Sequence, residues 1–229
     1  MEYGQRLIEI KDRIAAACQR VGRDPDEVTI VAVTKYIGAD ETAALVEAGQ
    51  QDLGENRLQV ALPKLDALAE RAPGVRWHYI GSLQTNKVKE VLQRFHLIHS
   101  LDRLSLAMEI DKRARALGIT VPCLVQVNVS GEESKGGFAP EEVAAFLGHL
   151  AEMPGIEVQG FMTMAPADVD PEAARPVFRG LRELRDRWLA EGTAPATATR
   201  LSMGMSGDFE IAVEEGAAFV RIGSILVKP

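Results

Sequence analysis

Val28-Thr29-Ile30-Val31-Ala32-Val33-Thr34 is a run of β-branched and apolar residues, and Lys35 follows it directly. Such a run is typical of a strand buried in a sheet, so Lys35 is expected to project from the end of that strand. A lysine fixed by a rigid strand and partly removed from water can attack a carbonyl carbon as a Schiff-base lysine. The alternative is a solvated lysine that begins a loop, and this segment alone does not separate the two.

Segments of strand character recur along the chain, and longer amphipathic segments lie between them. Asp170-Pro171, for example, has the pattern of an N-cap and first helical residue, and Gly192 marks the end of that helix. This alternation is typical of βα units around a parallel sheet. The predicted strands are residues 28–34, 51–54, 76–80, 97–100, 121–129, 156–162, 199–202 and 219–222.

The eight predicted strands favour an α/β fold that consists of a single (β/α)₈ TIM barrel. No linker rich in Pro, Gly or Ser divides the chain, and 229 residues fit one barrel domain. The expected domain is therefore 1–229, in which a helix over 1–22 packs on a barrel over 28–229. A doubly wound open sheet is the alternative, but no Gly-x-Gly-x-x-Gly follows the first strand.

Composition argues against several functional classes. The chain is 46% hydrophobic and 26% charged and has a net charge of −7, without a dense Lys/Arg cluster, which argues against nucleic-acid binding. No apolar run approaches the roughly 18 residues of a membrane span, and the N-terminus lacks a signal-peptide pattern, so a cytoplasmic protein is expected. Cys18 and Cys123 have the pattern of buried apolar residues, so neither a disulfide nor a metal site is expected.

A barrel of this kind carries its site at the carboxyl ends of its strands, so polar residues that follow the strands are expected to be neighbours. Ser206-Gly207-Asp208 follows the seventh strand, and Gly223-Ser224 follows the eighth. Backbone N–H groups and hydroxyls at this place can hold a phosphate group without a lysine cluster. The alternative is an ordinary strand-to-helix turn that Gly204 and Gly207 serve and in which Ser206 is a helix N-cap.

Arg221 lies two residues before Gly223, so the two residues share one face of the eighth strand. The guanidinium is therefore expected to point into the mouth of the barrel. It is there either half of a structural ion pair or a ligand contact. Its expected place beside a phosphate site and Lys35 favours the ligand contact. A lysine, a phosphate site and an arginine at one barrel mouth are the parts of a site for pyridoxal 5′-phosphate (PLP).

Five segments carry a resemblance to a known family: residues 32–35 (AVTK), 54–57 (GENR), 77–87 (WHYIGSLQTNK), 201–208 (LSMGMSGD) and 220–223 (VRIG). Taken together and in this order, they resemble the pyridoxal-phosphate homeostasis proteins, the YggS/PROSC family. The resemblance extends from about Leu7 to Ile225. The chain departs from it near the end, where Ser224 replaces the usual threonine but keeps the hydroxyl.

The resemblance implies a fold-type III PLP barrel similar to the N-terminal domain of alanine racemase, with PLP as the cofactor. It implies no catalytic residue and no metal ligand. Lys87 and Lys135 are two further lysines at which a secondary PLP adduct can form. The implied cofactor-binding residues are Lys35 as the internal aldimine, Ser206, Gly223 and Ser224 at the phosphate, Arg221 opposite the pyridine nitrogen, Asn56 near the ring, Met203 packed on the ring, and His78.

The resemblance further implies a protein of intracellular PLP (vitamin B6) homeostasis, with PLP-dependent apo-enzymes as partners and without efficient catalytic turnover. A permanent cation at Arg221 disfavours protonation of the ring nitrogen and so weakens the cofactor as an electron sink. A racemase also needs a second base, and none of the three tyrosines, Tyr3, Tyr36 and Tyr79, is obviously placed for that role.

Two alternatives to this function stay open at the level of sequence. One is a PLP-dependent racemase or related enzyme that acts on a small amino acid. The other is a barrel that binds a phosphate ligand without attachment to Lys35. A monomer is expected, because the chain lacks the second domain that forms the dimer in alanine racemase.

Overall fold

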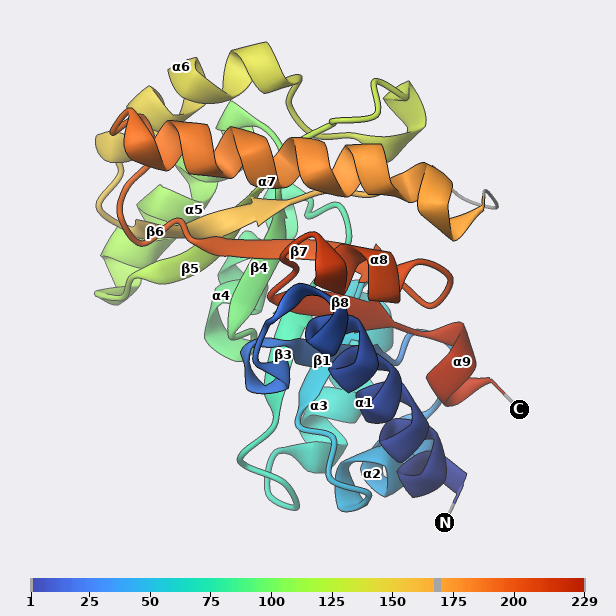
Figure 1. The fold of residues 1–229 in the computed structure, drawn as a ribbon. Coiled ribbons are helices and arrows are strands. Elements are labelled where there is room, and N and C mark those ends of the chain that lie inside the picture. Colours follow the sequence, from blue (N-terminus) through green and yellow to red (C-terminus); the bar gives the residue numbers. More distant parts are fainter. Residues whose placement is uncertain (1, 167–169, 229) are drawn as a thin grey trace.

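The computed structural model describes residues 2–166 and 170–228. Within them, eight parallel strands form a closed barrel in the order β1 to β8, and helices cover its outside (Figure 1). The barrel expected from the sequence is therefore confirmed. Met1, residues 167–169 and Pro229, which the expected domain of 1–229 includes, lie outside the described residues. The strands are β1 Thr29–Val33, β2 Asp52–Glu55, β3 Arg76–Tyr79, β4 Leu97–Leu101, β5 Val121–Gln126, β6 Ile156–Met162, β7 Arg200–Met205 and β8 Phe219–Ile222.

Helices connect the strands on the outside of the barrel. Asp170 begins one of these connections, because its carboxylate accepts a hydrogen bond from Glu172 N at 2.9 Å, as expected of an N-cap. No helix in the described parts of the chain is both long and apolar enough to cross a membrane. The helices are α1 Glu2–Val21, α2 Ala39–Glu47, α3 Leu58–Leu68, α4 Val88–Arg94, α5 Leu104–Leu117, α6 Pro140–Ala151, α7 Arg175–Ala190, α8 Phe209–Glu214 and α9 Ser224–Val227, with short 3₁₀ turns at Pro25–Glu27, Thr85–Lys87, Glu133–Lys135 and Pro171–Ala174.

The N-terminal helix α1 packs against the last helices of the chain. Its apolar face is buried along Leu7, Ile10 and Ile14, at the spacing of a helix that covers a core on one side. Arg6 Nη1 donates hydrogen bonds to the backbone oxygens of Leu226 (3.0 Å) and Lys228 (2.7 Å). Figure 1 shows α1 beside α8 and α9. The segment after β8 is thereby tied to the N-terminus.

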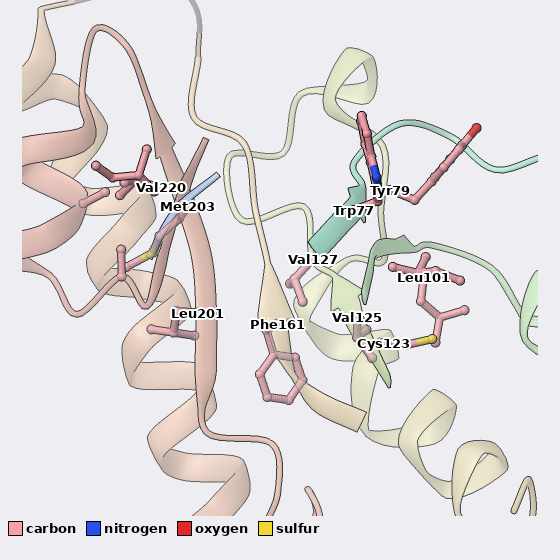
Figure 2. Packing of buried hydrophobic residues seen from close by; sticks show 14 of the residues in the cluster. Trp77, Tyr79, Leu101, Cys123, Val125, Val127, Phe161, Leu201, Met203 and Val220 are labelled. Atoms are coloured by element: carbon pink, nitrogen blue, oxygen red, sulfur yellow. The ribbon is translucent and has the colours of Figure 1, made fainter. Parts of the chain in front are cut away.

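Apolar side chains pack in two layers, one inside the barrel and one between the strands and the helices. Figure 2 shows Leu201 and Met203 of β7 and Val220 of β8 in the outer layer. Because successive side chains of a strand point to opposite faces, Ser202 points into the barrel. The inner layer consists of Val31, Leu97, Leu124, Met162 and Phe219.

Most predicted strand boundaries agree with the structure to within one residue, but two differ by three residues. β5 ends at Gln126 rather than at residue 129, because Asn128 N bonds to Phe138 O of the returning loop at 2.8 Å. β7 extends through Met205 rather than ending at residue 202. Its pairing with β8 shifts register within this stretch, where Gly204 has a φ of +94°. A glycine that reads as a turn in the sequence is therefore an irregularity inside a strand.

A buried ion pair lies beside the end of β1. Lys64 Nζ of α3 donates to Glu55 Oε1 and to Thr34 O, both at 2.6 Å. Thr34 Oγ1 donates to the same carboxylate oxygen at 2.6 Å. The Glu55 and Lys64 side chains are 0% and 4% exposed, and Glu55 Oε2 has no hydrogen-bond partner. The carboxylate therefore depends on Lys64 for the compensation of its charge.

Candidate functional site

One pocket at the mouth of the barrel is lined by five of the eight residues expected to bind the cofactor. It has a volume of about 520 Å³ and lies at the carboxyl ends of three strands, β1, β7 and β8. These strands meet because β8 pairs with both β1 and β7 in the closed barrel. The five residues are Lys35, Ser206, Arg221, Gly223 and Ser224.

Lys35 lies at the point where the chain leaves the sheet. Thr34 N still donates to Gly54 O of β2 at 3.1 Å, so the backbone just before Lys35 is held by the barrel. The Lys35 side chain is half-buried, and its Nζ lies 4.8 Å from the centre of the Tyr36 ring. Lys228 Nζ lies 4.9 Å from the centre of the same ring. Two amines thus share one exposed aromatic ring at the rim of the pocket.

A hydrogen bond joins the loops that follow β7 and β8. Gly223 N donates to Ser206 Oγ at 3.2 Å. The N-cap position of α8 is occupied by Asp208, whose carboxylate makes no capping hydrogen bond and instead accepts from Met205 N at 2.6 Å. Ser206 is therefore not an ordinary helix N-cap. Its hydroxyl instead fixes the distance between the two loops on which a phosphate group was expected.

The glycines of these loops are not explained by the packing of the protein itself. A Cβ atom added at Gly207 would meet no atom within 4 Å, and one added at Gly223 would lie 3.5 Å from Val33 Cβ, an ordinary contact. Gly204, in contrast, has a φ of +94°, and a Cβ there would lie only 2.5 Å from Ala212 Cβ. Gly204 thus serves the fold, whereas Gly207 and Gly223 leave room at the pocket.

Arg221 brings a positive charge to the bottom of the pocket. Its Nη1 donates to Ser202 Oγ at 2.6 Å, and its Nη2 donates to Thr163 O at 3.1 Å. Burial lowers the pKa of Arg221 to about 10, while the nearby Asp208 carboxylate opposes this shift. Burial in turn raises the pKa of Asp208. Arg221 therefore stays charged at neutral pH, as a cation that lines the pocket and is anchored from below.

Asn56 and Met203 do not line this pocket. Asn56 follows β2 and lines a second pocket, together with Lys87. Met203 is fully buried in the outer layer, on the face of β7 opposite to Ser202. The contacts predicted for Asn56 and Met203 with a cofactor ring therefore stay predictions, and the position of these two residues does not support them. Met203 points outward because successive side chains of β7 point to opposite faces and Ser202 points into the barrel.

His78 also lies away from the pocket, in the interior of the barrel. Its side chain is 1% exposed, with Nε2 at 2.9 Å from Asp52 Oδ1 and Nδ1 at 2.8 Å from His99 Nε2. Both ring nitrogens are therefore occupied by hydrogen bonds within the protein. Lys135, the other lysine considered for a second adduct, lies in the 3₁₀ turn Glu133–Lys135, with Nζ 3.9 Å from Glu132 Oε2, and does not line the pocket either.

Tyr36 and Lys228 line the pocket but were not assigned to the site from the sequence. Tyr36 follows Lys35 directly in the sequence, so its presence at the pocket could have been predicted. Lys228 reaches the pocket because Arg6 holds the last backbone turn against α1, and no spacing in the sequence indicates this contact. The site therefore contains a second amine that only the folded chain reveals.

Asp52 makes the stability of the barrel pH-dependent. Burial alone would raise the pKa of Asp52 above its ordinary 3.8, but hydrogen bonds from His78 and Arg76 outweigh burial and lower the pKa to about 2. A carboxyl group with a lowered folded pKa stabilises the fold above its unfolded pKa and loses that contribution as the pH falls through the folded pKa.

Asp52→Asn should therefore reduce the free energy of unfolding by about 2 kcal/mol near neutral pH and by progressively less from about pH 4 down to about pH 2. Urea titrations of wild type and variant across this range measure the difference. A difference that stays constant down to pH 2 would contradict the assignment of this contribution to the Asp52 carboxylate.

The fold and the pocket together define a (β/α)₈ barrel protein with two lysines, an arginine and two serines around one cavity at its mouth. The family model of the alanine racemase N-terminal domain matches residues 6–229. The pyridoxal phosphate homeostasis protein of Aquifex aeolicus is 44% identical over 226 residues, which are 99% of this chain and 97% of the relative. The chain therefore belongs to the alanine racemase N-terminal domain family, among the relatives that are named pyridoxal phosphate homeostasis protein.

Solved structures agree with this assignment. A protein from Bifidobacterium adolescentis has a TM-score of 0.91 at 38% identity, with 98% of this chain and 94% of that chain covered. PipY of Synechococcus elongatus, solved with PLP bound, has a TM-score of 0.86 at 30% identity, with 98% and 99% covered. Alanine racemase of Clostridium difficile is 18% identical with a TM-score of 0.71 and shares the fold over 55% of its length.

Proposed function

We propose that this chain is a PLP-binding protein of vitamin B6 homeostasis and that it holds PLP on Lys35. The Lys35 amine would hold PLP by condensation with its aldehyde carbon: a C=N bond would form, and the aldehyde oxygen would leave as water with the two amine protons. The observation that carries the proposal is the convergence of Lys35, Arg221, Ser206 and Ser224 on one pocket. PLP bound to PipY, a full-length relative, supports it.

The residues of the pocket fit the chemistry of PLP. Ser206 and Ser224 offer hydroxyls to a phosphate group, and Gly207 and Gly223 leave open the space that side chains would otherwise fill. Arg221 offers a cation and N–H donors to the ring side. When bound, PLP supplies an aldehyde for the amine and a conjugated ring. The protein supplies the position, the charge and the shielding from water.

The same residues favour holding the cofactor over turnover. Arg221, as a charged neighbour, disfavours protonation of the ring nitrogen and weakens electron withdrawal by the ring. Tyr79 is buried against Phe95, and Tyr36 lies beside Lys35 itself, so neither stands as a second base on the opposite face. Rapid exchange of the α-proton of alanine by the loaded protein in deuterated water would contradict this conclusion.

Removal of both serine hydroxyls should weaken the hold on the phosphate. Ser206→Ala combined with Ser224→Ala should speed the release of PLP by on the order of 100-fold, because each lost hydrogen bond to a charged group costs about 1.5–3 kcal/mol. Release is measured as the loss of visible absorbance during dilution into a PLP scavenger. Ser130→Ala, in a loop outside the pocket, is the control. An unchanged release rate in the double variant would refute the phosphate assignment.

We also propose that the protein works in the cytoplasm as a monomer and passes PLP to apo-enzymes. Cys18 and Cys123 are free and buried, which fits a reducing compartment. Tyr36 and Lys228 at the rim of the pocket are exposed, which fits transfer from the mouth of the barrel. Sedimentation of the loaded protein tests the monomer. Activation of a PLP-dependent apo-enzyme faster than by the same concentration of free PLP tests direct transfer.

A further inference from the structure

A line of buried polar side chains crosses the interior of the barrel and ends at Arg221. Four residues contribute side chains between that guanidinium and Arg76 at the opposite end of the barrel, and none of these residues is more than 7% exposed. The hydrogen-bonded atoms are Arg221 Nη1 and Ser202 Oγ (2.6 Å), Ser202 Oγ and His99 Nδ1 (2.8 Å), His99 Nε2 and His78 Nδ1 (2.8 Å), His78 Nε2 and Asp52 Oδ1 (2.9 Å), and Asp52 Oδ1 and Arg76 Nε (2.8 Å).

We call this line, from Arg221 through Ser202, His99, His78 and Asp52 to Arg76, the relay. With a neutral His78, its two ends fix the direction of every hydrogen bond in it. A carboxylate only accepts, so His78 Nε2 carries the proton that faces Asp52. The other nitrogen of a neutral His78 then accepts, so His99 Nε2 is the donor between the two rings. His99 Nδ1 accepts in turn from the Ser202 hydroxyl. Ser202 Oγ finally accepts from Arg221, which can only donate. Each hydrogen in the relay has one acceptor.

The opposite arrangement requires an additional proton on His78. Asp52 does not call for one, because Arg76 already pairs with both of its oxygens, at 2.8 and 2.5 Å. In that arrangement the Ser202 hydroxyl would also lose its acceptor. Burial, with the charge of Arg221 nearby, lowers the pKa of His99 well below its ordinary value, so His99 is not the place of an extra charge.

The surroundings keep water and other partners away from the two imidazoles. The Phe219 ring lies edge-on to both, with centroid distances of 5.7 Å to His78 and 5.3 Å to His99. His96 also lies edge-on to His78, at 5.9 Å, outside the relay. Among the described residues, His78 and His99 therefore depend on the relay for their hydrogen bonds. A change at one member must be felt by its neighbours, because buried polar groups have no water to replace a lost partner.

We propose that Ser202 and His99 are positioning residues for the ring-nitrogen side of the PLP site, because the relay from Asp52 fixes Arg221 in the orientation that faces the pocket. The positioning role of Ser202 and His99 toward PLP rests on the function proposed above. The hydrogen bonds of the relay do not depend on that function. Ser202 Oγ accepts from Arg221 while its own hydrogen goes to His99 Nδ1. His99, which lies below the pocket, therefore holds the hydroxyl that anchors the guanidinium.

The protonation pattern can be measured without any cofactor. Long-range ¹H–¹⁵N spectra of the histidine rings of the unloaded protein, assigned with His96→Gln and His149→Gln, report which nitrogen carries the proton. At neutral pH, His78 and His99 should both be neutral and protonated at Nε2. A proton on Nδ1 of either ring, or a doubly protonated His78, would overturn the relay. This result does not depend on whether Lys35 binds PLP.

The effect on the site is tested with Ser202→Ala in the PLP-loaded protein. PLP should remain attached, at one molecule per chain, but its release should become about tenfold faster, and the ring absorbance should shift, because Arg221 loses its anchor. Ser202→Thr, which keeps the hydroxyl, should restore release to within about twofold.

Ser100→Ala is the matched control, because Ser100 is a buried serine whose hydroxyl donates to Gly81 O outside the relay. His99→Phe should reproduce the effect of Ser202→Ala. Wild-type release and spectrum in Ser202→Ala, or an equal change in Ser100→Ala, would overturn the positioning role. Failure of wild type itself to take up PLP would instead refute the proposed function and leave the spectra of the unloaded protein as the test of the relay.

Discussion

Lys35→Ala is expected to abolish covalent binding of PLP: the purified variant should be colourless after incubation with the cofactor and should gain no mass on borohydride reduction. Lys35 is the amine that the last backbone bond of β1, from Thr34 N to Gly54 O, holds at the edge of the pocket. Arg221 and Ser206 line the same pocket, but neither can form a bond to an aldehyde that survives as a Schiff base.

Lys228→Ala is the sharpest control for this result. Lys228 lines the same pocket, and its amine lies 4.9 Å from the ring of Tyr36, much as that of Lys35 does. It stands on the last turn of the chain rather than on a strand. We expect the variant to keep the covalent adduct, and Lys87→Ala, in the second pocket, to keep it as well. An adduct that persists in Lys35→Ala and disappears in Lys228→Ala would reverse the assignment.

Lys64→Met should be the most destabilising of the substitutions considered, at a cost of about 3–5 kcal/mol in the free energy of unfolding. The substitution leaves the Glu55 carboxylate fully buried without its cation, and Glu55 Oε2 has no hydrogen-bond partner even in the intact pair. Because Lys64 Nζ also holds Thr34 O, the backbone before Lys35 loses a contact. Urea or thermal unfolding measures the loss.

Two comparisons separate this effect from a general loss of side-chain packing. Arg71→Met removes an exposed ion pair, 3.5 Å from Glu47, and should cost less than about 1 kcal/mol. Adding Glu55→Gln to Lys64→Met removes the stranded charge and should recover part of the stability. A Lys64→Met protein as stable as wild type would contradict the dependence of Glu55 on Lys64.

The fold could be predicted from the sequence because its signals are local. Each strand is a short run of β-branched and apolar residues, each helix has its own start and stop signals, and the alternation of the two determines a parallel barrel. The boundary of β7 could not be predicted in this way. Gly204 has the sequence signal of a turn, and only its pairing with β8 shows that it lies inside a strand.

The part of the site that could be predicted consists of residues that directly follow strands, because a closed barrel brings the ends of neighbouring strands together. Lys35, Ser206 and Ser224 each follow a strand, and the closed barrel brings them together. Met203 and His78 were expected at the site from the resemblance alone. Met203 points to the outer face of β7, and His78 is held in the barrel interior by Asp52 and His99.

The relay leaves no pattern in the sequence at all. His78 and His99 are 21 residues apart, and His99 and Ser202 are 103 residues apart. Such contacts follow from the register of strands around the barrel, which no single stretch of sequence encodes. The direction of the hydrogen bonds then follows from the chemistry of the two ends, Asp52 and Arg221.

The central claim, that Lys35 holds PLP, is tested most directly by borohydride reduction of the loaded wild-type protein, followed by intact mass and peptide mapping. Reduction fixes a Schiff base where it stands. We predict one adduct per chain, located on the peptide that contains Lys35. No adduct, or an adduct located on Lys87, Lys135 or Lys228 instead, would contradict the claim.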